Sequence, residues 1–204
     1  MTQLLYGTTN PGKLASMRRM LCALPVAVLG LRDVRPDWPA VEEQGRSPLD
    51  NARQKALAYH ACTHLPVFSC DSGLYLEGVP DAEQPGIHAR RVAGRALTDE
   101  EMIAHYAGWA VRMGGRITAR YRNAICLVMP DGTAHARMDD TLAGAPFHLA
   151  AVPHAQRTPG FPLDSLSIHI PTGRYWFDLP ESFDQLLTLD AGFSAFFRDV
   201  LGLA

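Results

Sequence analysis

The chain has 204 residues, 47% of them hydrophobic, and a net charge of −2 at pH 7, which favours one compact domain over residues 1–204. The near-neutral charge argues against a general attraction to nucleic acid or to anionic membranes. No apolar run approaches the ~20 residues of a membrane span, and the first residues lack the pattern of a signal peptide.

The cysteines and histidines give little sign of a metal or redox centre. Cys22, Cys62, Cys70 and Cys126 are scattered, with no pair at metal or redox spacing. This predicts reduced thiols in a cytoplasmic protein. The densest histidine cluster, at residues 60–64, falls where a helix is expected to end, a common place for histidine because it complements the helix dipole. We interpret that cluster as structural.

The amino-terminal segment predicts a strand, a polar loop and a helix. The strand covers residues 3–6, the loop is glycine-rich, and apolar side chains recur at helical spacing from Lys13 onward. Helix amino ends bind phosphate through free N–H groups. Lys13 is poorly placed there for the helix dipole unless an anion is also bound. The alternative is a lysine that lies along the surface.

Residues 7–13 also fit the spacing of a P-loop, G-x-x-x-x-G-K. The next residue should then be Ser or Thr, to hold magnesium, but it is Leu14. Pro11 also removes one of the backbone donors that such a loop uses. These departures disfavour a P-loop, and a P-loop kinase is kept only as a third hypothesis.

A second helix is predicted after a strand at residues 26–31 and a loop through residue 45. Ser47, Pro48 and Asp50 take the N-cap, N1 and N3 positions of this helix. Asp50 therefore has a structural explanation as the acid of a capping box. Asn51 and Lys55 lie one helical turn apart and share a face.

Residues 66–74 are the stretch around which we expect the chain to be organised. A short buried strand leads into Asp71, Ser72 and Gly73, and Gly73 permits a sharp turn that presents the two polar side chains. Ligands of open α/β sheets commonly lie at the carboxyl ends of strands. Taken alone, such a motif is more often a solvent-facing turn, so a functional interpretation depends on the other clusters.

The remaining sequence predicts strands at residues 74–79, 117–129, 166–170 and 174–179, and a hairpin strand after a turn at 130–133. Helices are predicted from Thr98, which opens a capping box, and from Asp190 as N-cap. Residues 145–162 have no clean period, so no element is expected there.

Three polar clusters thus adjoin regular elements, and together they suit a magnesium–polyphosphate substrate. Magnesium prefers hard oxygen ligands and shares the phosphate oxygens, while lysines offset the remaining negative charge. The clusters are Thr8, Asn10 and Lys13; Asp50, Asn51 and Lys55; and Asp71, Ser72 and Gly73.

These motifs resemble those of the inosine-triphosphate pyrophosphatase family. T-T-N-P-G-K at residues 8–13 is similar to the family's T-x-N-x-x-K, and D-N-A-R-Q-K-A at 50–56 to E-N-A-x-x-K-A. C-D-S-G-L at residues 70–74 resembles D-D-S-G-L, and residues 85–94 resemble P-G-x-x-S-A-R-x-x-G. Each motif alone is weak, but four in order at near-family spacing are specific.

The resemblance implies an α/β fold with a long twisted mixed β-sheet flanked by helices, two lobes with a central cleft, and a homodimer. It also implies Mg²⁺-dependent hydrolysis of nucleoside triphosphates, non-canonical purine nucleotides among them, to monophosphate and pyrophosphate. Asp71 would be the catalytic residue and, with Asp50, a metal ligand. The residues implied in substrate binding are Thr8, Asn10, Lys13, Lys55, Ser72, Gly73, Arg91, Phe161, Asp164 and Arg174.

The chain departs from the family pattern at several of these positions. Cys70 replaces the first acid of the D-D pair, Pro162 interrupts the glycine-rich loop, and Arg174 stands for a lysine. Leu-Asp-Ala-Gly at residues 189–192 occupies the place of the S-H-R that reads the base. The base preference therefore does not follow from the resemblance. Loss of the paired acid also leaves open a second hypothesis, a nucleotide-binding protein with little turnover.

Overall fold

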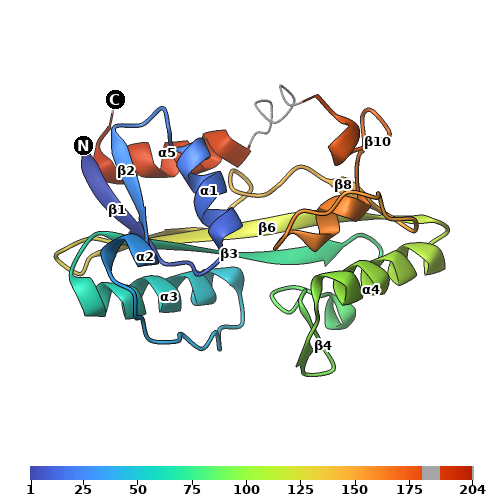
Figure 1. Ribbon diagram of the computed structural model, residues 1–204, viewed down its shortest axis with the longest axis horizontal. Helices are drawn as coiled ribbons and strands as arrows, with labels where there is room; N and C mark the ends of the chain where they lie inside the picture. The colour runs from blue at the N-terminus through green and yellow to red at the C-terminus, as the bar shows by residue number, and fades with distance from the viewer. Residues whose placement is uncertain (181–188, 204) are drawn as a thin grey trace. The chain divides into compact units, whose positions relative to one another are not determined.

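The computed structural model describes residues 1–180 and 189–203. Its strands form a mixed sheet in the order β10-β9-β8-β6-β3-β1-β2, with β7 paired to β6, and helices flank this sheet (Figure 1). The predicted α/β class with a long mixed sheet is thereby confirmed. The chain divides into two compact units. Unit 1 holds Met1–Ser72, Arg122–Ala143 and residues 189–203, and unit 2 holds Gly73–Tyr121 and residues 144–180.

Unit 1 is built on parallel strands at one end of the sheet. β1 pairs with both β2 and β3 in parallel, whereas β6 and β7 are antiparallel. Two long strands, β3 and β6, also contribute residues to unit 2. The elements with residues in unit 1 are β1 (Thr2–Tyr6), α1 (Pro11–Met20), β2 (Val26–Gly30), α2 (Leu31–Val34), α3 (Pro48–Thr63), β3 (Val67–Leu76), β6 (Arg116–Val128), β7 (Ala134–Arg137) and α5 (Leu189–Leu201).

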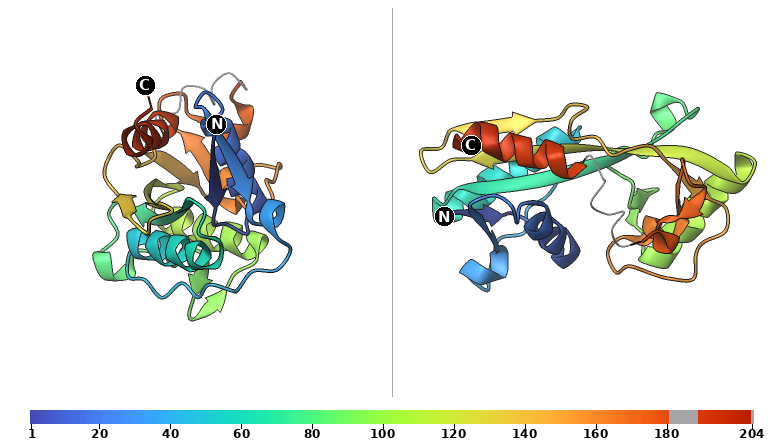
Figure 2. Two further views of the ribbon diagram at one scale, coloured as in Figure 1. Left: turned by 90° about the vertical axis from the view of Figure 1, so that its left-hand side faces the viewer. Right: turned by 90° about the horizontal axis from the view of Figure 1, so that it is seen from above.

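The strands of unit 1 bury both faces, as the alternation of side chains along a strand requires. Tyr6 and Phe68 stack with ring centroids 4.5 Å apart, and Phe197 of α5 meets Phe68 edge-on at 5.0 Å. The opposite face carries Leu5 and Val67, which pack against Tyr59 of α3. Helices α1 and α5 thus cover one face of these strands and α3 covers the other (Figure 2).

Unit 2 packs a helix and a 3-10 helix against the other strands. Its core joins Leu74 and Leu76 of β3 to Met102, Ile103 and Tyr106 of the long helix. The elements of unit 2 are η1 (Asp81–Glu83), β4 (Arg91–Val92), β5 (Arg95–Ala96), α4 (Asp99–Arg112), β8 (Phe147–Ala150), η2 (Pro162–Leu166), β9 (Ser167–His169), β10 (Arg174–Tyr175) and η3 (Trp176–Asp178).

The structure corrects one central prediction. Residues 67–76 form a single strand, β3, so the expected sharp turn at Asp71, Ser72 and Gly73 is wrong. Gly73 does not take a positive φ. It is instead closely packed, because a Cβ there would lie 2.9 Å from the Tyr75 ring. The polar side chains of this motif therefore project from within a strand and not from its end.

Other elements were predicted with uneven success. The capped helices α3 and α4, the long strand β6 and its hairpin with β7 are confirmed. The strand β8 and the short helix α2 were missed, and the strand expected at residues 174–179 gives way to η3 after Tyr175. A carboxyl-terminal helix is present as α5, but it begins at Leu189, so Asp190 lies within the helix and the prediction of Asp190 as N-cap is wrong. None of the described helices is long and apolar enough to cross a membrane.

Candidate active site

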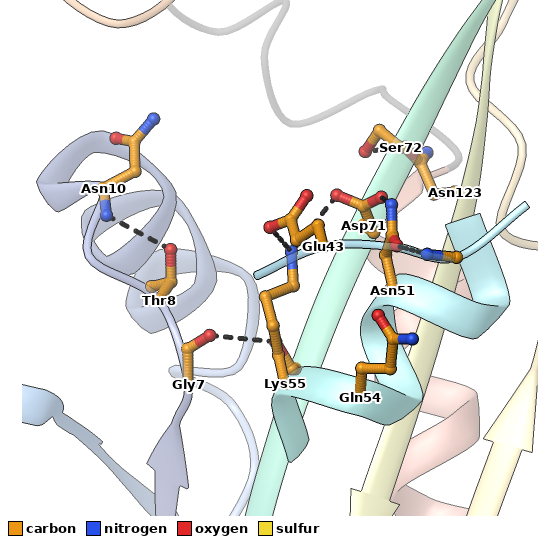
Figure 3. Close-up of polar contacts among 12 residues, drawn as sticks. Gly7, Thr8, Asn10, Glu43, Asn51, Gln54, Lys55, Asp71, Ser72 and Asn123 are labelled. Atoms are coloured by element: carbon orange, nitrogen blue, oxygen red, sulfur yellow. Dashed lines mark hydrogen bonds and ion pairs between the residues drawn. The ribbon is translucent and has the colours of Figure 1, made fainter. Parts of the chain in front are cut away.

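The candidate active site of unit 1 centres on the buried carboxylate of Asp71, which retains only 7% of its exposure. Nδ2 of Asn51 donates to Oδ2 of Asp71 over 3.0 Å, and Nζ of Lys55 lies 3.2 Å from Oδ1 (Figure 3). Both oxygens of the acid are thus held by side chains from one face of α3. The prediction that Asn51 and Lys55 share a face of α3 is confirmed.

Local sequence explains why α3 lies so close to β3. Ser47 caps the helix by accepting a hydrogen bond from the Asp50 amide, and Pro48 stands at its first position. Ala52 and Ala56 are fully buried against Ala124 and Cys126 of β6. Small side chains allow the helix backbone to approach the sheet closely, which brings the polar side chains of α3 within reach of Asp71.

Glu43 is a site residue that the sequence analysis missed. Its Oε1 lies 2.8 Å from Nζ of Lys55, so the ammonium group contacts two carboxylates at once (Figure 3). Glu43 lies in an irregular segment before α3, where no periodicity marks it. The only local signal is the glycine two residues later.

Gly45 fixes the segment that carries Glu43. Its backbone N–H donates to Oδ1 of Asn51 over 2.9 Å. A Cβ at residue 45 would lie 2.5 Å from that oxygen and 2.5 Å from the Asp50 Cβ, so only glycine permits this approach. Asn51 thus links Asp71 to Gly45, and Lys55 links Asp71 to Glu43.

The environment of Lys55 favours its charged form. Burial lowers the pKa of this ammonium group, but the charge of Asp71 and the hydrogen bond and charge of Glu43 outweigh burial and raise the pKa above its ordinary value. Lys55 therefore enters the site as a full positive charge at neutral pH.

The loop after β1 is ordered by its own side chains. Oδ1 of Asn10 accepts hydrogen bonds from the N–H groups of Gly12 and Lys13, at 2.8 and 3.2 Å, and the Asn10 N–H donates to Oγ1 of Thr8 at 3.2 Å. Helix α1 therefore begins at Pro11, earlier than predicted, with Asn10 as its N-cap. Ser69 of β3 donates to the Gly7 carbonyl over 2.9 Å, which ties this loop to the strand that carries Asp71.

Cys70 presents a neutral thiol at the position of the family's first acid. Burial raises its pKa to about 12, although the Lys13 charge and a hydrogen bond with the Tyr6 hydroxyl oppose this shift. It belongs to the core cluster that packs against α1 and α5. Because neighbours in a strand face opposite sides, Cys70 and Asp71 project to different faces of the sheet.

Asp50 acts at the start of α3. Its Oδ2 accepts from the Ser47 hydroxyl at 2.9 Å and from the Arg46 N–H at 3.1 Å, and these hydrogen bonds lower the pKa of the carboxyl. Asp50 therefore stabilises the start of α3, through the Ser47 hydroxyl and the Arg46 N–H. The partners of Asp50 are thus Ser47 and Arg46, whereas those of Asp71 are Asn51 and Lys55. The proposal that Asp50 is also a metal ligand stays a prediction.

Ser72 is positioned by a second buried amide. Its hydroxyl donates to Oδ1 of Asn123 over 2.7 Å, and Nδ2 of Asn123 donates to the Leu142 carbonyl over 2.7 Å. The sequence predicts only a strand at residues 117–129, so the role of Asn123 in holding Ser72 was not foreseen.

The other predicted substrate residues belong to unit 2. Arg91 and Arg174 are exposed on β4 and β10, Phe161 is half-buried directly before η2, and Asp164 lies within η2. The Phe161 carbonyl accepts from the Asp164 N–H at 3.2 Å. Gly73 also belongs to unit 2, and binding of substrate by these residues stays a prediction.

The segment before Phe161 is tied to the start of α4. Asp99 accepts from Arg90 at 2.7 Å and from the Gly160 N–H at 3.1 Å. Both hydrogen bonds lower the pKa of Asp99. No set of three or more His, Cys, Asp and Glu side chains with metal-binding geometry occurs among the described residues.

Comparison with known proteins places this chain in a family. The model of the Ham1 family matches residues 4–161. The chain is 31% identical over 204 residues to the dITP/XTP pyrophosphatase of Geobacter sulfurreducens, a match that covers 99% of this chain and 98% of the relative. It is 36% identical over 151 residues to the dITP/XTP pyrophosphatase of Rhodopseudomonas palustris, covering 71% and 70%. The chain therefore belongs to the Ham1 family.

Solved structures agree on the fold. A HAM1 protein from Coxiella burnetii superposes with a TM-score of 0.73 at 24% identity, covering 100% of both chains. A nucleoside-triphosphatase / dITP/XTP pyrophosphatase from Mycobacterium abscessus gives a TM-score of 0.63 at 25% identity, covering 99% of this chain and 98% of the other. The sequence resemblance to this family is confirmed.

Proposed function

We propose that this chain is a nucleoside-triphosphate diphosphatase, which hydrolyses a non-canonical purine nucleoside triphosphate to the monophosphate and pyrophosphate. Family membership and the dITP/XTP pyrophosphatase activity named for its relatives support the reaction class. The observation that carries the proposal is the buried Asp71 carboxylate, whose two oxygens are held by Asn51 and Lys55.

The residues of unit 1 suit in-line displacement at phosphorus. Asp71 would orient the attacking water and accept its proton, because a carboxylate fixed by two donors is a positioned general base. Lys13 and Lys55 would offset the negative charge of the triphosphate and of the departing pyrophosphate. The capped start of α1, with Thr8 and Asn10, would place backbone dipoles beside the phosphates.

The donor set also fits a divalent cation. Asp71 and Glu43 offer hard carboxylate oxygens that are brought together through one lysine, and magnesium binds through few carboxylates while sharing the substrate's phosphate oxygens. We propose Mg²⁺ held by Asp71 and Glu43, with Asp50 as the competing candidate. When bound, the ion would supply charge stabilisation at the phosphoryl group.

A matched pair of variants separates the two candidate acids. Glu43→Gln should weaken Mg²⁺ binding in calorimetry, whereas Asp50→Asn should leave it unchanged and lower only the thermal unfolding midpoint, because Asp50 serves the helix cap. The reverse pattern would assign the ligand role to Asp50.

The proposals for the quaternary state and for the cellular compartment each rest on one observation. The four cysteines are all unpaired, two exposed and two buried, which fits a reducing cytoplasm. A homodimer rests on the family resemblance, and sedimentation of the purified chain tests it. The assignment of residues 1–204 to one domain is kept as a proposal.

The deciding experiment is pyrophosphate release with Mg²⁺ across a nucleotide panel that includes dITP, XTP and the canonical triphosphates. The proposal requires release from at least one purine nucleotide that falls to background in Asp71→Asn. The panel also gives the base preference, because the family's S-H-R is replaced at residues 189–192.

One observation favours a second candidate, a nucleotide-binding protein with little turnover. The neutral thiol of Cys70 stands where the family has an acid. Tight nucleotide binding with release no faster than in Asp71→Asn would establish that function instead.

A further inference from the structure

The ammonium group of Lys55 lies between the two acids that we assign to the metal. It is 2.8 Å from Oε1 of Glu43 and 3.2 Å from Oδ1 of Asp71. The side chains of Lys55 and Asp71 are only 12% and 10% exposed, so water screens this pair poorly. Figure 3 shows the lysine reaching from α3 toward both carboxylates. The ammonium group thus takes the position of a cation that pairs with both acids and balances one of their two negative charges.

The two acids are held in place independently of this lysine. Asn51 binds the other oxygen of Asp71 at 3.0 Å and also binds the N–H of Gly45, two residues after Glu43, at 2.9 Å. Asn51 is itself buried, with 2% exposure. Removing Lys55 from its position would therefore take away a charge but leave the acids near each other.

A divalent cation and an ammonium group repel each other at such distances. A cation held between Glu43 and Asp71 therefore competes for the position that the ammonium group of Lys55 now takes. Lys55 needs another anion after this exchange, because a buried ammonium group without a partner is costly. The phosphate oxygens of a bound triphosphate meet that need.

We infer that Lys55 is an exchangeable counter-ion: it pairs with Glu43 and Asp71 before the metal binds and transfers to a substrate phosphate when the metal enters. This inference rests on the proposed function, since it takes the metal ligands and the triphosphate from it. Its consequence is coupling. Nucleotide gives Lys55 a new partner and so strengthens metal binding, and by thermodynamic reciprocity the metal strengthens nucleotide binding.

The counter-ion role predicts that loss of the Lys55 charge raises the affinity for Mg²⁺ and lowers the affinity for the nucleotide. Lys55→Met keeps the apolar stem but removes the charge, so the nucleotide-free variant should bind Mg²⁺ about tenfold more tightly than the unmodified chain. Its affinity for a non-hydrolysable triphosphate should fall. A lysine that only contacts phosphate predicts unchanged metal affinity, and a lysine that only supports the fold predicts a loss of both.

Titration calorimetry of the full chain with MgCl₂, and separately with the non-hydrolysable nucleotide, makes the test. Lys55→Arg is the matched control: it keeps a positive charge at this position and should not gain affinity for Mg²⁺. Lys55→Gln replaces Lys55→Met if the latter does not fold, as judged by thermal unfolding, and should also bind the metal more tightly.

Unchanged or weaker Mg²⁺ binding in the neutral variants overturns the inference. Pyrophosphate release by the unmodified chain tests the proposed function separately. A chain that turns over nucleotide while its neutral variants gain no metal affinity overturns the counter-ion role alone, whereas an unmodified chain that binds no Mg²⁺ even with nucleotide overturns both.

Discussion

Nδ2 of Asn51, in the first turn of α3, donates to Oδ2 of Asp71, in the middle of β3, over 3.0 Å. The residues are 20 positions apart in the chain. Among the described residues, Lys55 is the only charged donor that contacts the Asp71 carboxylate. Asp71 is thus oriented by a neutral amide and charge-balanced by a lysine, so both of its oxygens are fixed in position.

Asp71→Asn should reduce kcat by about 10²–10⁴-fold, the usual contribution of a positioned general base. The amide keeps the size of the side chain, so the affinity for a non-hydrolysable triphosphate, measured without Mg²⁺, should change little. Steady-state kinetics and calorimetry together check this expectation. Turnover equal to that of the unmodified chain would remove Asp71 from the chemistry.

Lys13→Ala should raise KM for triphosphates by about 10- to 100-fold, since it deletes one charge-assisted hydrogen bond to phosphate. The cap of α1 uses the backbone N–H of Lys13 and not its side chain, so the thermal unfolding midpoint should hold. Arg18→Ala, on the same helix and paired with Asp33, is the control and should leave KM alone. An unchanged KM in Lys13→Ala would argue against the loop as a phosphate-binding element.

Cys70 should resist alkylation. A thiol whose pKa is about 12 holds only about one thiolate in ten thousand molecules at pH 8, and the thiolate is the reactive form. The exposed Cys22 and Cys62 serve as internal references. Iodoacetamide labelling followed by mass spectrometry should modify both references long before Cys70. Comparable rates would show that the Cys70 thiol is ionised or accessible.

Gly45→Ala should lower the free energy of unfolding by about 1–3 kcal/mol, the usual cost of forcing an extra methyl group into a packed site. The methyl group would collide with Oδ1 of Asn51 and with the Asp50 Cβ. Because this displaces the segment of Glu43, Mg²⁺ affinity should fall as well. Denaturant unfolding and calorimetry measure the two effects. Gly132→Ala is the control that separates backbone strain from collision. Gly132 lies in an exposed turn with a φ of +85°, and no atom lies within 4 Å of the new Cβ. This variant should therefore lose stability but keep its affinity for Mg²⁺.

Acid should weaken the tie between α4 and Gly160. The folded pKa of Asp99 lies below its ordinary value of 3.8, through the hydrogen bonds of Arg90 and Gly160. Its contribution to stability is therefore present above pH 3.8 and is lost as the pH falls through the lower, folded value. Between pH 5 and pH 2 the thermal unfolding midpoint should fall further in the unmodified chain than in Asp99→Asn. Equal falls would mean that Asp99 adds nothing to the acid response.

Local signals carried the sequence predictions that succeeded. The caps of α3 and α4 depend on residues within three positions of each other, so Ser47 and Thr98 marked both helices correctly. The triphosphate motifs also led to Asp71 and Lys55, which the structure brings together. Thr8 and Asn10 were found as polar loop residues, but their use in ordering the loop was not.

The misses depend on contacts between distant residues. The role of Glu43 in the site depends on its contact with Lys55, 12 residues later in the chain. No periodic pattern marks the segment around Glu43. Gly73 suggested a turn because glycine permits one, whereas the structure needs it for its lack of a side chain. Strand β8 is four residues long, which is too short for its alternation of Phe147 and Leu149 to stand out between prolines.

Because β3 is continuous through Asp71, the position of the Asp71 carboxylate depends on the register of this strand. If β3 slipped by one residue against its neighbours, every side chain would change faces. Asp71 would then enter the aromatic core, and Phe68 would be turned out toward α3. The stack of Phe68 on Tyr6 therefore does more than fill space: it fixes which face of the strand carries the acid, so substitutions deep in this core should impair turnover without touching a single polar group.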